Sequence, residues 1–533
     1  MQHDPHISGA ADESNHYDED QAGFLAFVDA AMEDERDTRC GLFGGPGSGK
    51  TFTMQRAAAL AQARSWAVLL IGPTHQATGV LAGSVPGASP LDPNPEVPLR
   101  AGMIYFATAH RFASWRQEGR SAQAAAGVAN PAPRDSWRGR ALAADVGDPP
   151  RGWLIVLDEA SMYTGQMVVA IDVVAATLRQ QGRPVILVAV GDEDQLAPVR
   201  GPNYEYVDGE APQQPSPLVD LAAHDRSFRL GQNHRTDLAE IREAVETYKQ
   251  RGVILPPAPE RPAYRWVEAG PEIEAEMAER MREDTLHERP PQASAFAVSY
   301  LREQVANMNR TLSLSVHEHD VNEIRPGDRM RVQSTYCPSG LTLLASSDIV
   351  RVSKVWWVEG DENVSYLLPP RKGHSGVYRR SVMAAFEAML DDLPPMMMVE
   401  MRIGRSSVTA PVEIVGEGAE QPSAHFWKML VSRVQNAARM AGDRQQANGL
   451  RAIAYHLLDN ARVKIEPPFA MTSHRAQGST FDEVYVLADS PAGGRVVNHW
   501  IEDARRGSTY VMMSRARSRL TIVWQPQNEL LAW

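Results

Sequence analysis

The chain has 533 residues, a formal net charge of −12, and hydrophobic and charged contents of 43% and 23%. This length predicts roughly three or four domains, and the composition is that of an ordinary globular protein. Only two cysteines occur, which argues against a disulfide framework or a zinc module and favours a reducing compartment, so we expect a cytoplasmic protein. No apolar run is long enough to span a bilayer. The negative charge argues against coating of duplex nucleic acid, although a local basic groove is compatible with it.

The first half of the chain has the pattern of a parallel α/β domain. Residues 1–16 are polar and acidic and predict a disordered tail, and 17–32 predict a helix with one apolar face. Continuous apolar runs, which are typical of strands buried on both faces, occur at 40–43, 67–72, 103–107, 153–157 and 185–190. Because helical segments separate these runs, we expect an α/β fold with a parallel sheet.

A glycine-rich loop follows the first predicted strand and fits the phosphate-binding pattern G-x-x-x-x-G-K-[ST]. Its residues are Gly44, Gly45, Pro46, Gly47, Ser48, Gly49, Lys50 and Thr51. The glycines let successive N–H groups face phosphate oxygens at the start of a helix. Lys50 would reach the β- and γ-phosphates, and the Thr51 hydroxyl would ligate Mg²⁺. We therefore expect a nucleoside triphosphate site, with an unliganded glycine-rich turn as the alternative.

Polar side chains follow two later strands. Asp158 and Glu159 come directly after 153–157, at the edge where parallel sheets bind their ligands. Asp158 would hold Mg²⁺, and Glu159 would polarise an attacking water. Gln195, after the strand at 185–190, could sense the γ-phosphate. The alternatives are the acidic first turn of a helix for the pair and a solvated acidic loop around Gln195.

The second half changes character twice. A strand at 293–298 and a helix at 301–312 continue the α/β pattern, whereas 324–370 alternates with the period of two that is typical of antiparallel strands. This alternation predicts a small β-barrel inserted into a second core. Helices are predicted at 381–393 and 423–459, and parallel strands return at 484–487 and 520–523.

The motifs resemble, in their order, those of superfamily 1 helicases, and most closely the RecD/Dda-like branch, superfamily 1B. The segments Asp158–Met162 and Gly191–Val199 resemble motifs II and III. The other segments that carry the resemblance are Gln21 (the adenine-reading glutamine), Gly72–Ala77 (motif Ia), Thr108–Arg111, Leu230–Arg235 (motif IV), Thr472–Thr480 (motif V) and Tyr510–Arg517 (motif VI). The resemblance spans about residues 17–525.

The resemblance implies two RecA-like P-loop cores with parallel sheets, and an SH3-like β-barrel with helical additions inserted in the second core. The implied domains are a tail at 1–16, a first core at 17–228 with an insertion at 112–152, a second core at 229–319 and 466–533, and the inserted barrel and helices at 320–465.

The resemblance also implies the site residues. The implied catalytic residues are Lys50, Asp158, Glu159, Gln195, and two candidate arginine fingers, Arg235 and Arg515. The implied ATP-binding residues are Gln21, Gly45, Pro46, Gly47, Ser48, Gly49, Lys50, Thr51 and Gly478, with Thr51 and Asp158 on Mg²⁺. The implied nucleic-acid contacts are Thr74, His75, Thr108, His110 and His474. Aromatic residues that could stack on bases, or pack in the core instead, are Phe112, Trp115, Trp356 and Trp357.

The implied function is an ATP-dependent DNA helicase that moves 5′ to 3′ on single-stranded DNA as the two cores close on ATP, in replication, repair or recombination. Its expected partners are single-stranded DNA and duplex junctions, with single-strand-binding or replication proteins as candidates, and we expect a monomer with no membrane partner. The alternatives are a P-loop ATPase that remodels protein or RNA partners without unwinding DNA, and an RNA helicase of the same superfamily.

Overall fold

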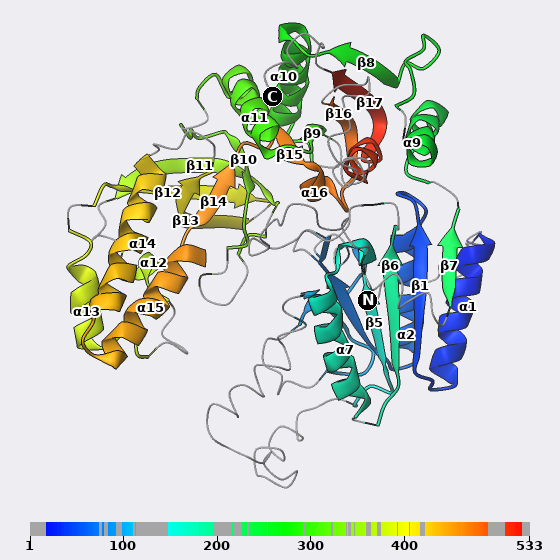
Figure 1. Ribbon diagram of the computed structural model, residues 1–533, viewed down its shortest axis with the longest axis horizontal. Coiled ribbons are helices and arrows are strands. Elements are labelled where there is room, and N and C mark those ends of the chain that lie inside the picture. The colour runs from blue at the N-terminus through cyan, green and yellow to red at the C-terminus, as the bar shows by residue number, and fades with distance from the viewer. Residues whose placement is uncertain are drawn as a thin grey trace, which may run out of the picture.

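The computed structural model contains two parallel α/β cores and a barrel domain that projects to one side (Figure 1). It describes residues 18–524 except 74–76, 79–80, 82–83, 92–98, 110–111, 113–147, 181, 193–194, 196–215, 217–225, 232–233, 253, 291–293, 321–322, 337, 339–342, 346, 359–363, 370–374, 392, 405, 416–421, 460 and 489–506. Across these described ranges, no helix is both long and apolar enough to cross a membrane.

The first core is a sheet of seven parallel strands in the order β3-β4-β2-β5-β6-β1-β7. Its strands are β1 (Thr38–Gly44), β2 (Ala67–Gly72), β3 (Ser89–Pro90), β4 (Ile104–Thr108), β5 (Trp153–Leu157), β6 (Val185–Gly191) and β7 (Ser227–Leu230). Its helices are α1 (Glu19–Glu33), α2 (Lys50–Ala63), the short 3₁₀ helix η1 (Ala160–Met162) and α7 (Gly165–Arg179). Because β7 pairs with β1, this sheet extends past residue 228, the predicted end of the first core.

Both faces of the first sheet are covered, which explains its unbroken apolar strands. Along β2, Val68 and Leu70 pack on one side with Phe24 of α1 and Met54 of α2. Leu69 and Ile71 pack on the other side with residues of α7. Buried apolar side chains on both faces remove the alternation that a half-exposed strand would have. The phosphate loop therefore connects β1, most of whose residues are buried, to α2, which buries one face against the sheet.

The second core is a smaller parallel sheet in the order β15-β9-β16-β17-β8. Its strands are β8 (Tyr264–Glu268), β9 (Ala295–Ser299), β15 (Ala470–Thr472), β16 (Phe481–Ala488) and β17 (Ala516–Trp524). Its helices are α9 (Ala239–Arg251), α10 (Pro271–Leu286), α11 (Arg302–His317) and α16 (Ser473–Ala476). Because β9 pairs with both β15 and β16, two segments far apart in sequence form one sheet around the inserted domain.

The insertion is a closed barrel with helices packed on one side. The barrel strands are β10 (Arg329–Val332), β11 (Ile349–Val358), β12 (Met396–Ile403), β13 (Ser406–Ile414) and β14 (Val463–Glu466). The helices are α12 (Val364–Leu367), α13 (Arg380–Glu387), α14 (Pro422–Met440) and α15 (Arg444–Asp459). Neighbouring strands are antiparallel except β13 and β14, which pair in parallel, and the pairing of β14 with β10 closes the barrel.

The topology confirms the predicted fold class of two parallel cores with an inserted barrel. The predicted barrel segment at 324–370 supplies only β10 and β11, however, and β12 to β14 complete the closure. The sequence did not predict β12, because the run Met396–Met398 is apolar on both faces of the strand and lacks the alternation of an antiparallel strand. Met397 faces the barrel core, whereas Met396 and Met398 pack against the helices. The helix predicted at 381–393 also ends earlier, at Glu387.

Candidate active site between the two cores

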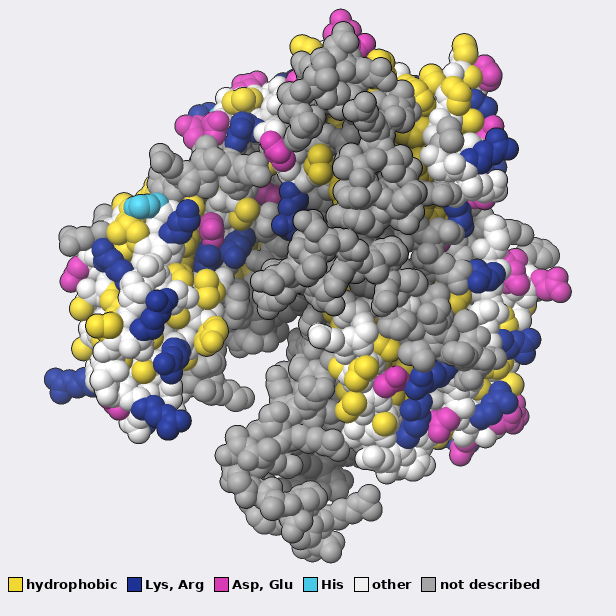
Figure 2. Space-filling view, viewed as in Figure 1, with side chains coloured by type: hydrophobic (Ala, Val, Ile, Leu, Met, Phe, Trp, Pro, Cys, Tyr) yellow, Lys and Arg dark blue, Asp and Glu magenta, His cyan; other side chains and the backbone are white. Residues whose placement is uncertain are grey.

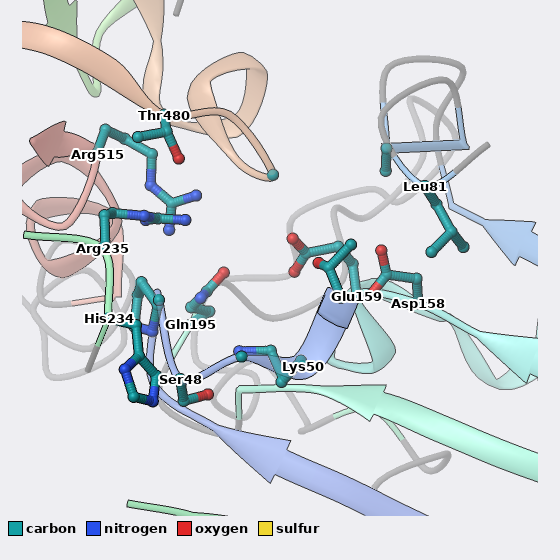
Figure 3. A pocket seen from close by; sticks show the side chains of 16 residues that line it. Ser48, Lys50, Leu81, Asp158, Glu159, Gln195, His234, Arg235, Thr480 and Arg515 are labelled. Atoms are coloured by element: carbon teal, nitrogen blue, oxygen red, sulfur yellow. The ribbon is translucent and has the colours of Figure 1, made fainter. Parts of the chain in front are cut away.

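A cavity of about 320 Å³ lies where the two cores meet. Its described lining comes from the phosphate loop, the segment after β2, the ends of β5 and β6, the segment after β7, and the second core (Figure 3). The residues that line it are Pro46, Gly47, Ser48, Gly49, Lys50, Thr51, Ala77, Leu81, Asp158, Glu159, Gln195, His234, Arg235, Gly478, Thr480 and Arg515. The structure therefore brings together all six predicted catalytic residues.

The phosphate loop has the backbone geometry that its glycines predict. Gly47 and Gly49 have φ angles of 79° and 87°, a left-handed region that residues with a Cβ rarely adopt. Lys50 begins α2, and its ammonium group donates hydrogen bonds to the carbonyls of Gly44 at 2.6 Å and Gly45 at 2.9 Å. Burial lowers the pKa of Lys50, and the nearby carboxylates oppose this shift. The Lys50 ammonium group, held by these carbonyls, lines the cavity and is placed to meet an incoming phosphate.

Gln21 lies beside this loop. It is buried in the first turn of α1, and its backbone N–H is capped by the Asp18 side chain at 2.7 Å. A Cβ placed on Gly49 would come within 2.5 Å of the Gln21 amide nitrogen. The predicted adenine-reading residue therefore touches the phosphate loop without lining the cavity itself, and Gly45 likewise lies in the loop but outside the cavity lining.

The carboxylates of Asp158 and Glu159 enter the cavity from the end of β5 (Figure 3). Burial, and then the negative charge of Glu159, raise the pKa of Asp158 to about 7. Glu159 has φ 52° and ψ 51°, an uncommon left-handed conformation for a residue with a side chain. Backbone strain of this kind concentrates at functional sites. The Glu159 carboxylate also accepts a hydrogen bond of 3.1 Å from Gln477 of the second core.

Gln195 faces the same cavity from the loop after β6. Its amide donates to Asp192 at 3.2 Å, and the same carboxylate oxygen accepts a hydrogen bond of 2.9 Å from the Tyr510 hydroxyl of the second core. Across the part of the chain that the structure describes, Ser48 Oγ and Gln195 Oε1 are buried with no hydrogen-bond partner. Buried polar atoms are rarely left without a partner, so these two atoms are consistent with a polar ligand in the cavity.

Arg235 and Arg515 lie together on the side of the cavity opposite Asp158 (Figure 3). Arg235 donates to the carbonyl of Ser514 at 2.5 Å. Arg515 donates to the carbonyls of Val511 and Ser479 at 3.0 and 3.2 Å. Burial, and then the charge of Arg515, lower the pKa of Arg235 to about 9. Burial also lowers the pKa of Arg515. A buried guanidinium group, Arg515, beside a half-buried one, Arg235, repels it and favours an anion between the cores.

The prediction missed Ala77, Leu81, His234 and Thr480, which line the cavity, and Gln477 and Tyr510, which contact Glu159 and Asp192 at its edge. The backbone N–H of His234 donates to Gly47 of the phosphate loop at 2.6 Å, next to Arg235, which reaches the second core. The chain segment between the cores thus contacts both sides of the cavity. His234, Gln477 and Tyr510 each lie inside a segment that carries the resemblance, but the sequence assigned them no role, because their contacts are made with another part of the chain across the cleft.

The residues present fit a magnesium ion. No cluster of three or more His, Cys, Asp or Glu side chains with metal-binding geometry occurs among the described residues. Mg²⁺ does not require one, because it is commonly held by one or two carboxylates together with substrate phosphates and waters. Asp158 and Thr51 both line the cavity beside the phosphate loop, so a carboxylate and a hydroxyl are available where the β- and γ-phosphates would lie.

The predicted nucleic-acid contacts are only partly visible. Thr74, His75 and His110 lie outside the described residues, as does Trp115. Thr108 is buried at the end of β4. His474 lines a second cavity of about 560 Å³ between α11, the barrel and α16, together with Arg302, Arg310, Arg331 and Arg475. Burial, and then the charge of Arg302, lower the pKa of His474.

The aromatic candidates divide into two groups. Phe112 is fully buried in the first core, as the core alternative predicts. Trp356 and Trp357 on β11 are 37% and 45% exposed, so the core alternative is wrong for them and they remain available for stacking. Although the whole chain is acidic, Lys and Arg side chains are spread over the face of the helical part of the barrel domain, with few carboxylates among them (Figure 2).

One family model matches most of the first core. Residues 29–201 match the family model described as an AAA domain. This matched segment contains the first-core side of the cavity, including Lys50, Glu159 and Gln195. A comparison with curated proteins gives no match.

Among solved structures, the chain is similar to several described as Pif1 helicases. One comes from work on DNA unwinding at forked dsDNA by two coordinating Pif1 helicases, with 13% identity, coverage of 96% of this chain and 92% of that chain, and a TM-score of 0.45. Bacteroides Pif1 bound to ssDNA has 14% identity, coverage of 95% and 92%, and a TM-score of 0.44. Pif1 helicase from Candida albicans has 15% identity, coverage of 95% and 94%, and a TM-score of 0.39.

Proposed function

We propose that this protein is an ATP-dependent DNA helicase of superfamily 1. The observation that supports this best is the cavity between the cores, where Lys50 and Glu159 of one core face Arg515 of the other. A nucleotide bound there would touch both cores, so binding and hydrolysis would change how they sit against each other. The motif resemblance over both cores supports a nucleic-acid motor rather than another P-loop ATPase.

The proposed mechanism assigns a role to each group in the cavity. Backbone N–H groups of the loop and Lys50 hold the β- and γ-phosphates. Glu159 accepts the proton of the attacking water, and Arg235 and Arg515 stabilise the charge that develops on the γ-phosphate. Mg²⁺, held by Thr51 and Asp158, would neutralise phosphate charge when bound. Hydrolysis cleaves the γ-phosphate, and its release as inorganic phosphate removes the anion that draws the arginines toward the loop. The cleft then opens, and the cores shift along a strand bound to both.

Loss of the Lys50 ammonium group tests the nucleotide site. We expect Lys50→Ala to abolish ATP hydrolysis with little loss of fold, because the ammonium group faces the cavity. Glu159→Gln should still bind ATP but turn it over very slowly, since it keeps its shape and loses the base. Steady-state hydrolysis with and without single-stranded DNA measures both variants. A wild-type enzyme that single strands do not stimulate would favour the remodelling ATPase, and stimulation by RNA alone would favour an RNA helicase.

We also propose movement from 5′ to 3′. The barrel lies between β9 and β15 of the second core, the position that the 5′-to-3′ branch of the superfamily is expected to use. Displacement of duplexes that bear one single-stranded tail tests the direction. We expect unwinding from a 5′ tail. Unwinding from a 3′ tail alone would contradict the branch assignment and leave the ATPase proposal intact.

A further inference from the structure

Three arginines lie side by side across three neighbouring strands of the barrel. In the register of the sheet, Arg329 of β10 is directly opposite Arg351 of β11, and Arg351 is directly opposite Arg402 of β12. We call these three residues the arginine row. Like charges directly opposite each other on a sheet destabilise it. A row of three therefore lowers the stability of the folded barrel. Packing of the barrel core does not explain why three arginines stand there.

The arginine row points away from the barrel core. The neighbouring residues Met330, Val350 and Met401 fill that core, and alternate residues of a strand point to opposite faces. On its outer side, the row lines a cavity of about 330 Å³, to which Arg289 after α10 adds a fourth guanidinium group. None of the residues that line this cavity lines the nucleotide cavity or the His474 cavity.

The carboxylates near the row do not balance its charge. Glu288 forms an ion pair with Arg351 and lies 3.9 Å from Arg402, but its side chain is 61% exposed. Asp284 lies 3.6 Å from Arg289 and also 3.4 Å from Arg280 of α10. Arg329 donates instead to the backbone carbonyls of Asp284 and Arg289, at 3.1 and 3.0 Å. The cavity thus has four guanidinium groups and one exposed carboxylate on its lining, which is an arrangement that favours an anion.

We propose that the arginine row binds the phosphate backbone of a nucleic-acid strand, outside the nucleotide cleft. Strands lie about 4.8 Å apart, so the row extends over roughly 10 Å, whereas one DNA strand carries a charge about every 3.4 Å along its axis. The row therefore suits a chain of phosphates better than a single phosphate. Arg331, two residues along β10, lines the His474 cavity, so the row and that cavity are neighbours along one barrel strand. This inference rests on the proposed function.

The first test is the salt dependence of DNA binding, measured by fluorescence anisotropy of a labelled single strand and of a forked duplex. The double variant Arg351→Gln with Arg402→Gln removes two charges of the row. The matched control, Lys354→Gln with Arg325→Gln, removes two charges from exposed ion pairs of the same domain. We expect the slope of log K against log salt to become less negative by about 1.4 in the row variant, because each phosphate that an arginine neutralises on a single strand accounts for about 0.7 of the slope. In the control, the slope should change by less than half as much.

A second variant works in the opposite direction. Glu288→Gln removes the carboxylate that competes with phosphate for the row, so we expect it to tighten DNA binding. Arg402→Gln should leave the thermal midpoint of the DNA-free protein unchanged or higher, because it relieves repulsion. If the arginines of the row instead served to stabilise the fold, Arg402→Gln would lower the thermal midpoint.

Equal slopes in the row and control variants, with a wild type that binds single strands and is stimulated by them, would overturn the arginine row alone. A wild type that neither binds DNA nor responds to it would overturn the proposed function, and the arginine row with it.

Discussion

The nucleotide cavity and the junction between the barrel and the second core both hold positive charge away from water. The two regions differ in the groups that bind the cations. In the cavity, Lys50 and Arg515 donate to carbonyl oxygens, and burial lowers the pKa of each. At the junction, Arg331 of β10 is buried and forms two hydrogen bonds of 2.9 and 2.6 Å to one oxygen of Glu466. Lys50 and Arg515 are thus held by carbonyl oxygens, whereas Arg331 is held by a carboxylate.

The junction is a small network that connects three elements. Glu466 at the end of β14 also accepts from Arg475 of α16 at 2.6 Å, and Arg331 donates to the carbonyl of Ala470 on β15 at 2.7 Å. These bonds join the barrel to the segment that carries His474 and Gln477. Since Gln477 contacts Glu159, the junction helps to position one contact of the nucleotide cavity.

The largest effect should come from the ligand-facing arginine. We expect Arg515→Gln to lower ATP hydrolysis by about 10³- to 10⁵-fold, the usual contribution of an arginine that stabilises the transferred phosphoryl group. Arg517→Gln is the matched control, because Arg517 is half exposed and pairs with Asp482 on the surface. Single-turnover hydrolysis measures both. If the two variants hydrolyse ATP equally well, the guanidinium group of Arg515 has a structural role and the contrast between the two regions fails.

Breaking the junction should mainly reduce stability. Glu466→Gln leaves the buried charge of Arg331 without its carboxylate, and we expect a loss of about 3–5 kcal/mol in the free energy of unfolding. Glu323→Gln removes one partner of an exposed pair with Arg325 and should cost less than about 1 kcal/mol. Urea unfolding measures the difference. Similar losses in the two variants would mean that the ion pair of Arg331 and Glu466 stabilises the fold no more than an exposed ion pair does.

The smallest effect concerns pH. The positive charge of Arg331, and then that of Arg475, hold the pKa of Glu466 below its usual value against the opposing effect of burial. The folded state therefore binds fewer protons at Glu466 than the unfolded chain, so stability rises with pH in this range. This contribution is complete above the unfolded pKa of about 4.3 and is lost as the pH falls through the lower, folded pKa.

The dependence of thermal stability on pH below about pH 5 tests whether Glu466 stabilises the fold in this way. We expect Glu466→Gln to have a flatter decline in thermal midpoint between about pH 5 and pH 3 than the wild type. Parallel declines would show that Glu466 titrates normally and that its ion pairs contribute little.

Local sequence determined the first core and half of the nucleotide site. Short-range patterns predicted the phosphate loop, the acidic pair at 158–159 and the buried strands. Phosphate binding by a loop and burial of a strand on both faces each depend on residues that are consecutive in the sequence. The structure places Lys50, Asp158 and Glu159 in one cavity, as these patterns predict. The RecD/Dda-like branch and the direction of movement stay predictions.

Tertiary structure decided the features that depend on register and on contacts between distant segments. The strand β12 was hidden because Met396–Met398 is covered on both sides, and the closure of the barrel depends on β14, far along the chain from β10. The arginine row combines one residue from each of three strands, so no local sequence pattern predicts it. Arg235 and Arg515 meet because two cores pack together. Spacing along a chain encodes local geometry, whereas only packing brings together charges that lie hundreds of residues apart.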